Sequence, residues 1–188
     1  MNLAVQEYLI PAPEYLAGEQ HSDIRHEYVA GQVFAMAGAG EKHNRISLNI
    51  AFHLRAAARG KECGVFISDM KVRVEHNNAY YYPDVMVTCD PQDTESLHKR
   101  SPCLIVEVLS PATEAIDRRE KLVAYRTLPS LRYYLLVSQE RRQVEFYTRD
   151  TDNRWLITVA ENNGTLEILC DDLKVSFSLD DIYEDVRL

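Results

Sequence analysis

The sequence is poor in features that would divide it into parts. Seven glycines and seven prolines occur singly among 188 residues, with no flexible linker, repeat or low-complexity tract. No segment supplies the roughly 20 consecutive apolar residues that a membrane-spanning helix needs, and the first residues lack the basic-then-apolar order of a signal peptide. We therefore expect residues 1–188 to form a single domain of a cytoplasmic protein.

The four cysteines lack the spacing of a metal site. Cys63, Cys89, Cys103 and Cys170 include no CxxC pair and have no histidine at zinc-finger spacing, which argues against structural zinc. Cys89 and Cys103 adjoin apolar runs. We expect reduced, partly buried thiols that pack as small apolar side chains.

Basic residues are outnumbered, with 21 of them against 29 acidic residues and a net charge of −8. This balance disfavours a protein that coats nucleic acid without regard to sequence. Residues 118–142, however, carry seven basic side chains and two acidic ones, a local charge of +5 that leaves −13 elsewhere. Their arginines are candidates for phosphate contact, or else they pair with neighbouring acids on a solvated face.

Apolar residues make up 46% of the chain, enough for one sizeable core, and their spacing predicts a mixed α/β fold. A strand, a helix and a second strand between residues 103 and 137 predict a right-handed parallel crossover. Helices are expected at 13–20, 41–59 and 114–128, and β-rich runs at 28–36, 65–74, 80–87, 103–109, 131–137, 144–148, 155–160 and 165–170.

One carboxylate interrupts the most apolar of these strands. Glu107 stands between Val106 and Val108, and burying it without compensation would cost several kcal/mol. The structural explanation is an ion pair with a basic side chain such as Lys121 or Arg118. The functional explanation is a cation or a substrate at the end of the strand.

A second carboxylate, Asp84, follows Pro83 at the head of another apolar run. Alone it is typical of a turn or the start of a strand. If the two strands pair, however, Asp84 and Glu107 would supply two hard oxygen ligands of the kind that Mg²⁺ or Mn²⁺ prefers.

These residues carry a family resemblance that extends over about residues 5 to 180. The order of Pro83-Asp84, then Glu107 in an Ile-Val-Glu-Val strand, then a helix resembles the PD-(D/E)XK nuclease superfamily. The wider pattern is similar to the bacterial Uma-type family of restriction-endonuclease-like proteins. It comprises His26-Glu27-Tyr28, Gly31, Met36, Gly38, His43, Tyr82-Pro83-Asp84, Glu107 to Thr113, Asp117, Lys121, Tyr125 and Leu131 to Tyr134.

The resemblance implies a restriction endonuclease-like mixed β-sheet flanked by helices, with additional β-hairpins. It implies a nuclease that uses Mg²⁺ or Mn²⁺, with Asp84, Glu107 and the backbone carbonyl of Val108 as metal ligands. Glu27 matches a further acidic residue of the family, although it is equally interpreted as a surface acid. His43 is a site residue by resemblance, whereas its place at the start of a helix favours a local hydrogen bond.

One position departs from the superfamily pattern. The lysine expected two residues after the glutamate is replaced by Leu109. A helix that packs over the sheet can return an ammonium group to the same place, and Lys121, which matches a lysine of the Uma-type family, is the best candidate. Its structural alternative is an i, i+4 pair with Asp117. Lys71 is a second, weaker candidate.

The leading hypothesis is therefore a metal-dependent endonuclease that hydrolyses phosphodiester bonds of nucleic acid, with DNA as the expected substrate. Asp84, Glu107, Lys121 and Glu27 are its candidate catalytic residues. The alternatives are a non-catalytic nucleic-acid-binding or assembly protein that retains the fold, and a metal hydrolase of small phosphoesters. No membrane partner is expected, and a homodimer is compatible with a small nuclease that cuts both strands.

Overall fold

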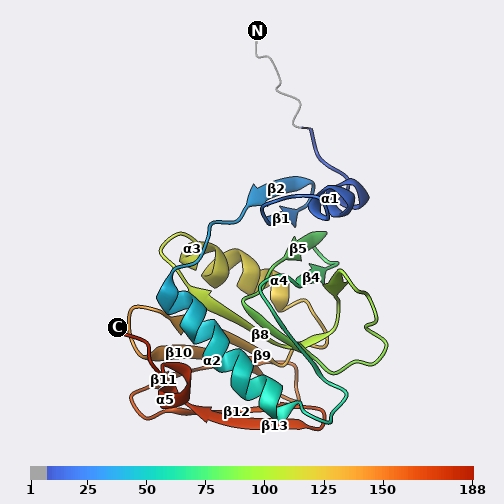
Figure 1. Ribbon diagram of the computed structural model, residues 1–188. Helices are drawn as coiled ribbons and strands as arrows, with labels where there is room; N and C mark the ends of the chain where they lie inside the picture. Colours follow the sequence, from blue (N-terminus) through green and yellow to red (C-terminus); the bar gives the residue numbers. More distant parts are fainter. Residues whose placement is uncertain (1–7) are drawn as a thin grey trace.

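A six-stranded mixed sheet forms the centre of the molecule (Figure 1). The computed structural model describes residues 8–188. In spatial order the sheet contains β11 (Trp155–Glu161), β10 (Gln143–Arg149), β9 (Tyr133–Ser138), β8 (Pro102–Leu109), β6 (Val85–Thr88) and β3 (Gly64–Ile67). The pair β8 and β9 is parallel, which confirms the parallel arrangement expected for the strands on either side of the helical segment.

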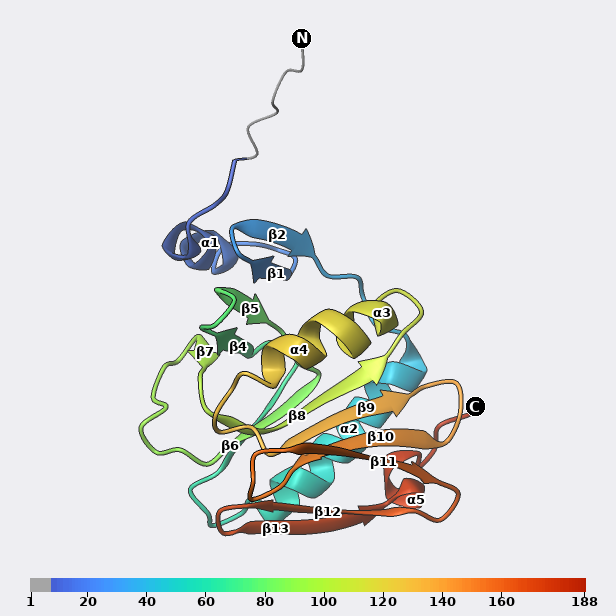
Figure 2. The same cartoon turned by 180° about the vertical axis from the view of Figure 1, so that it is seen from behind.

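One face of this sheet packs against the long helix α2 (Glu41–Ala57). Its apolar side chains Ile46, Ile50 and Leu54 recur at helical spacing and are fully buried against the sheet. The helix ends before Gly60, whose φ of +77° suits glycine. A two-stranded hairpin of β12 (Thr165–Cys170) and β13 (Leu173–Ser178), followed by α5 (Leu179–Ile182), completes this layer (Figure 2).

The opposite face is covered by a helical segment that connects β8 to β9. The sequence predicts one helix over residues 114–128, but the structure has α3 (Glu114–Ile116), a π-helical turn η1 (Asp117–Lys121) and α4 (Leu122–Tyr125). Tyr125 and Leu128 are buried against this face together with Leu109 of β8. A π-helical turn inside a helix is frequent at functional sites.

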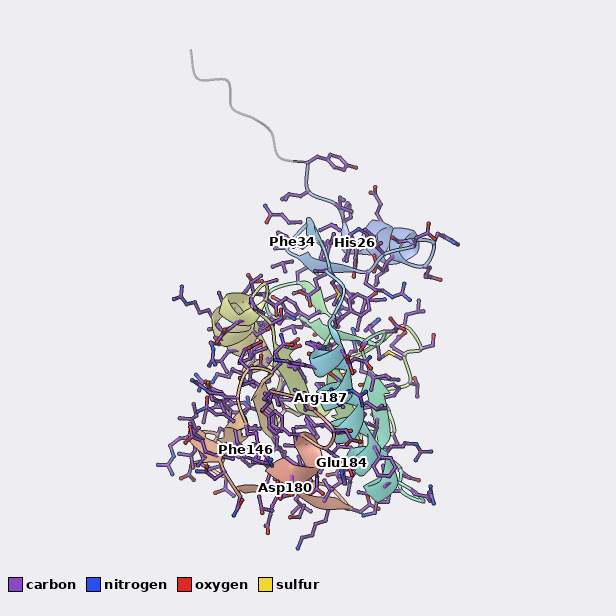
Figure 3. The ribbon with its side chains drawn as sticks, turned by 60° about the vertical axis from the view of Figure 1, so that its left-hand side comes forward. His26, Phe34, Phe146, Asp180, Glu184 and Arg187 are labelled. Atoms are coloured by element: carbon purple, nitrogen blue, oxygen red, sulfur yellow. A yellow bond between two sulfur atoms is a disulfide. The ribbon has the colours of Figure 1, made fainter. Side chains whose placement is uncertain are left out.

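A smaller five-stranded sheet lies above this segment in Figure 1. It is preceded by α1 (Ala12–Glu19), and Tyr15, Tyr28 and Tyr80 form a separate aromatic cluster between the helix and the sheet. Figure 3 shows the labelled residues His26 and Phe34 in this layer, well apart from Asp180 and Glu184. In spatial order its strands are β2 (Gln32–Ala35), β1 (His26–Val29), β5 (Ala79–Tyr81), β4 (Lys71–Val74) and β7 (His98–Lys99).

Two of the β-rich runs each contribute to both sheets, which the sequence did not predict. The run 65–74 breaks at Ser68, whose φ is +42°, so that β3 joins the large sheet and β4 the small one. The run 80–87 breaks between β5 and β6 at Pro83, which has no N–H to donate to a ladder. This second break places Asp84 at the junction of the two sheets.

The prediction of reduced thiols is wrong for all four cysteines. Cys63 is bonded to Cys89, and Cys103 is bonded to Cys170. The antiparallel pairing of β3 with β6 brings Cys63 and Cys89 together, and the end of β12 packs beside the start of β8. Pairing of this kind depends on which strand ends meet, and sequence spacing does not reveal that.

No helix among residues 8–188 is long and apolar enough to cross a membrane.

Candidate active site

Asp84 and Glu107 lie on the same face of the large sheet, on neighbouring strands. In the antiparallel pair of β6 and β8, Val85 is opposite Val106, so continuing this register by one residue puts Asp84 opposite Glu107. Residues directly opposite each other project to the same face. Asp84 Oδ2 accepts a hydrogen bond of 2.7 Å from the backbone N–H of Val108, which fixes the carboxylate beside Glu107.

Glu107 is 3% exposed and is satisfied by two donors from the covering helical segment. Its Oε1 accepts hydrogen bonds from Lys121 Nζ at 3.2 Å and from Tyr125 Oη at 2.9 Å. Lys121 and Tyr125 are four residues apart and therefore project to the same side. The buried carboxylate of Glu107 is therefore compensated by the helical segment that the sequence predicted to carry Lys121.

Lys121 lies among three carboxylates. Its Nζ is 2.9 Å from Glu27 Oε1, 3.2 Å from Glu107 Oε1 and 3.3 Å from Asp117 Oδ1. The pair with Asp117 expected from helical spacing is therefore present, and it coexists with the contact to Glu107. Leu109 lies on the same face of β8 as Glu107 but packs into the apolar cluster under α4.

Glu27 enters the site from the small sheet. Besides the contact with Lys121, its Oε1 accepts a hydrogen bond of 3.2 Å from the backbone N–H of Tyr82, two residues before Asp84. The side chain is 14% exposed, so it is not the surface acid of the alternative interpretation. Lys71, in contrast, donates to Tyr82 Oη at 3.1 Å and belongs to a second buried cluster with Glu19.

The carboxylates outnumber the cations in this cluster, and the pKa values reflect that excess. Burial raises the pKa of Glu107 well above its ordinary value; the Lys121 ammonium opposes this rise, and the charges of Asp117, Asp84 and Glu27 add to it. Burial lowers the pKa of Lys121, but the surrounding carboxylates reverse this and raise it well above its ordinary value. Lys121 is therefore held as an ammonium. The raised pKa of Glu107 means that this carboxylate favours binding a proton or a cation.

His43, near the start of α2, contacts Asp84 as well. Its Nε2 is 3.2 Å from Asp84 Oδ2. Burial lowers the pKa of His43, but hydrogen bonds to Asp84 and to the backbone of Val108 raise it above its ordinary value. A hydrogen bond raises the pKa of a histidine when the ring donates it, so the Val108 backbone group that interacts with His43 is the carbonyl. The interpretation of His43 as a purely local helix residue is wrong.

The donor set fits a hard divalent cation. Among residues 8–188 no three histidine, cysteine, aspartate or glutamate side chains are already arranged to hold a metal ion. Mg²⁺, however, is bound through one or two carboxylates and keeps several waters, which is the set that Asp84, Glu107 and the Val108 carbonyl provide. Asp117 Oδ1 is buried, and the Lys121 ammonium that it contacts at 3.3 Å is shared with Glu27 and Glu107, so negative charge is in excess in this cluster.

The cluster opens into a cleft between the small sheet and the large one. The walls include the linker from β2 to α2 and the loop after β8, which Figure 1 shows side by side at one end of the molecule. Arg25, Asn44, Ser110 and Thr113 line this cleft together with Asp84, Glu107 and Lys121. A polar ligand can therefore reach the carboxylates from solvent.

The basic segment 118–142 is partly neutralised by neighbouring acids. Arg118 pairs with Glu114 at 2.7 Å and also with Glu145, and Arg142 pairs with Asp180. Arg126 lies over the rings of Tyr147 and Trp155. These contacts match the alternative in which the arginines form a solvated, acid-paired face.

Sequence reasoning assigned no role to Tyr125, which donates to Glu107. Its i, i+4 spacing from Lys121 was the available signal. Asp117 was considered only as a partner of Lys121, yet its carboxylate also raises the pKa of Glu107.

Comparisons with known proteins identify the family of the chain. Residues 12–181 match the model of the Uma2 family, described as "Putative restriction endonuclease". The chain is 39% identical over 171 residues to an uncharacterized protein of Synechocystis sp. (strain ATCC 27184 / PCC 6803 / Kazusa), covering 90% of this chain and 89% of that protein. A second uncharacterized protein of the same strain is 32% identical over 173 residues, covering 90% and 93%.

A solved structure shares the fold. It is described as the crystal structure of "a putative nuclease belonging to DUF820" from Anabaena variabilis ATCC 29413, and it aligns with a TM-score of 0.69 at 13% identity. The alignment covers 86% of this chain and 91% of that chain. This likeness confirms the restriction endonuclease-like mixed α/β fold, and the family match over residues 12–181 shows that the chain belongs to the Uma2 family of restriction endonuclease-like proteins.

Proposed function

We propose that this protein is a Mg²⁺- or Mn²⁺-dependent endonuclease that hydrolyses phosphodiester bonds of nucleic acid, with DNA as its substrate. Membership of a restriction endonuclease-like family supports nuclease activity in general. The single observation that carries the finer proposal is the placement of Asp84 and Glu107 on one sheet face, at a cleft, with the Lys121 ammonium 3.2 Å from Glu107.

Asp84, Glu107 and the Val108 carbonyl would hold the cation, and Glu27 would contribute a further carboxylate. When bound, such a cation lowers the pKa of a coordinated water and stabilises negative charge on a phosphate oxygen. Tyr125 holds Glu107 in place through its hydrogen bond of 2.9 Å. His43 holds Asp84 through the contact of 3.2 Å between its Nε2 and Asp84 Oδ2.

Lys121 orients the attacking water and does not remove its proton. Its raised pKa keeps it protonated near neutral pH, and a protonated amine has hydrogens to donate but no lone pair to accept one. It therefore acts as a donor to the nucleophile or to the phosphate oxygen on which charge develops. Because position 109 is a leucine, the ammonium group comes from Lys121 on the helical segment. It still lies close to Glu107.

Cleavage of supercoiled plasmid DNA tests the proposal. The wild-type chain should nick or linearise the plasmid in Mg²⁺ or Mn²⁺ and not in a chelator. Asp84→Ala and Glu107→Ala should each reduce the rate by at least about 10²-fold, since removal of one essential charged group costs that much in comparable sites. Glu114→Gln, an exposed acid on the same helical segment, is the matched control.

Circular dichroism establishes that each variant is folded. Cleavage that survives in both folded Asp84→Ala and Glu107→Ala would contradict the proposed site.

The second candidate is a non-catalytic nucleic-acid-binding or assembly protein, favoured by the leucine at position 109 and by the net charge of −8. Calorimetric titration with Mg²⁺ and Mn²⁺ separates the two, because an absence of binding at millimolar metal favours this candidate. A hydrolase of small phosphoesters is separated by comparing nucleotides with DNA as substrates.

A further inference from the structure

Strand β11 ends the large sheet with an unpaired edge. Among residues 8–188 its only partner strand is β10, and its seven residues lie along the rim of the sheet in Figure 2. The other edge strand, β3, has four residues. The large sheet therefore offers one long edge at which a further strand can add.

The backbone groups that face outward follow from the hydrogen-bond pattern. The N–H of Asp150 donates to the carbonyl of Arg154, and the register of β10 with β11 continues without a shift. Hydrogen-bonded and non-hydrogen-bonded pairs alternate in an antiparallel ladder. The N–H and C=O groups of Trp155, Ile157, Val159 and Glu161 thus point away from β10.

The side chains of this edge are apolar and exposed on both faces of the sheet. Leu156, Ile157 and Val159 are 53%, 54% and 52% exposed. Edge strands of monomeric proteins are usually protected by charged residues, proline or bulges, but residues 155–160 contain no charged residue and no proline. An edge of this kind is a template for strand addition.

We propose that β11 pairs antiparallel with β11 of a second copy of this chain, about a twofold axis at Thr158. In this register all seven residues of the strand are paired. The outward backbone groups of Ile157 meet those of Val159 of the partner subunit, and Leu156 lies opposite Ala160 of the partner subunit. A large side chain is thereby matched with a smaller one in every pair except that of Thr158 with its own copy.

Charge complementarity favours a second copy as the occupant. Trp155 would lie opposite Glu161 of the partner subunit on the same face. The guanidinium of Arg149 lies 4.8 Å from the centre of the Trp155 ring, and that of Arg126 lies 5.6 Å from it. The partner's Glu161 thus approaches two cations, and the twofold axis repeats this contact at the other end of the strand.

The arrangement is closed. An isologous interface uses the same patch on both subunits and ends at two copies. The large sheet then runs continuously through both protomers, and neither β11 edge remains open.

Sedimentation velocity over the micromolar range tests the proposal. The wild-type chain should sediment with twice the mass of one chain, and Ile157→Lys should be monomeric at the same concentrations with an unchanged circular dichroism spectrum. Leu169→Lys is the matched control, because Leu169 is a 48% exposed apolar residue on β12 and lies outside the interface. This control should remain dimeric.

A cross-link tests the register independently of stability. Thr158→Cys places two thiols in a directly opposed pair, and oxidation should give a covalent dimer that the wild-type chain does not form. A monomeric wild-type chain, or a dimer that Ile157→Lys leaves intact, would overturn the proposal. A dimer in which folded Thr158→Cys does not cross-link would overturn the register.

Discussion

At the scale of single residues, the site is organised around one buried ammonium group. Lys121 is 5% exposed and bridges Glu27, Glu107 and Asp117, which come from three different segments of the chain. Buried charges are tolerated only when they are paired and hydrogen-bonded. Lys121 is thus the residue on which the buried carboxylates depend.

Replacing Lys121 with methionine should destabilise the protein and make it dependent on a cation. Loss of one partner of a buried ionic cluster costs about 3–5 kcal/mol. In Lys121→Met, added Mg²⁺ should raise the free energy of unfolding by more than it does in the wild type, because the cation replaces the lost positive charge. Urea denaturation with and without Mg²⁺ measures both effects.

The control is Lys99→Met, which removes another buried lysine, bound to the carbonyls of Asp93 and Glu95. Lys99→Met should be less stable than the wild type, but added Mg²⁺ should stabilise it no more than it stabilises the wild type. Equal responses to Mg²⁺ in the two variants would contradict the account.

The residues of the site were predictable to different degrees. Glu107 and Asp84 stand out because each is a charge in an apolar strand. Lys121 stands out because Leu109 replaces the expected lysine, so that the following helix has to supply the ammonium group. His43 and Tyr125 carry weaker signals, namely a place in the family pattern and an i, i+4 spacing from Lys121, since a histidine and a tyrosine are ordinary in a helix. Their roles depend on how α2 and α4 pack on the sheet, which residue spacing alone does not give.

At the scale of elements, the long periodic segments were predictable and the breaks were not. The helix at 41–59 and the strand at 103–109 agree with α2 and β8 to within two residues at each end. The breaks at Ser68 and Pro83 occur because one continuous run serves two sheets. Strand β13 was missed, and so was the two-residue β7, which lies between the runs predicted at 80–87 and 103–109.

The short strand β7 gives a prediction about acid stability. His98 is 7% exposed, and neither ring nitrogen has a hydrogen-bond partner among the described residues. Burial lowers the pKa of His98 below its ordinary value of 6.5. The unfolded chain therefore binds the proton first, and stability present above pH 6.5 should be lost as the pH falls through the lowered pKa.

His98→Phe should lose less stability than the wild type as the pH falls, because the contribution from His98 protonation is gone. Urea denaturation at a series of pH values from neutral to 5 measures this difference. His76→Asn, at an exposed histidine, should leave the loss unchanged. An identical pH dependence for His98→Phe and the wild type would exclude this explanation.

The disulfide between Cys103 and Cys170 joins the start of β8 to the end of the β12–β13 hairpin. The two residues are 67 positions apart, so the chain-entropy model gives a stabilisation of about 4 kcal/mol. The double variant Cys63→Ala, Cys89→Ala isolates this bond. Its free energy of unfolding should fall by about 4 kcal/mol on reduction.

Mass spectrometry with thiol alkylation confirms the redox state in each sample. If the measured stability is the same before and after complete reduction, the bond does not tether the hairpin as described.

At the scale of the whole molecule, the distribution of charge bears on the proposed contact with nucleic acid. The chain has a net charge of −8, and several arginines of the segment 118–142 are paired with acids. The carboxylates at the cleft repel phosphate until a divalent cation offsets them. Contact with nucleic acid is therefore expected to be narrow and dependent on that cation.

Binding to a DNA duplex should accordingly be weak in a chelator and stronger in Ca²⁺, which is a hard cation with the same preference for oxygen ligands. Glu107→Ala should abolish the increase, while Glu114→Gln should retain it. Fluorescence anisotropy with a labelled duplex measures the dissociation constants. Equal affinities with and without Ca²⁺ would argue that binding does not involve the carboxylates.

The central claim is that Asp84, Glu107 and the Val108 carbonyl together hold a divalent cation. Anomalous diffraction from crystals soaked in Mn²⁺ tests it most directly, because the signal locates the ion without reference to activity. The account predicts a peak in the cleft within about 2.0–2.6 Å of an oxygen of each of these three residues. A peak bound elsewhere, or no peak at millimolar Mn²⁺, would contradict it.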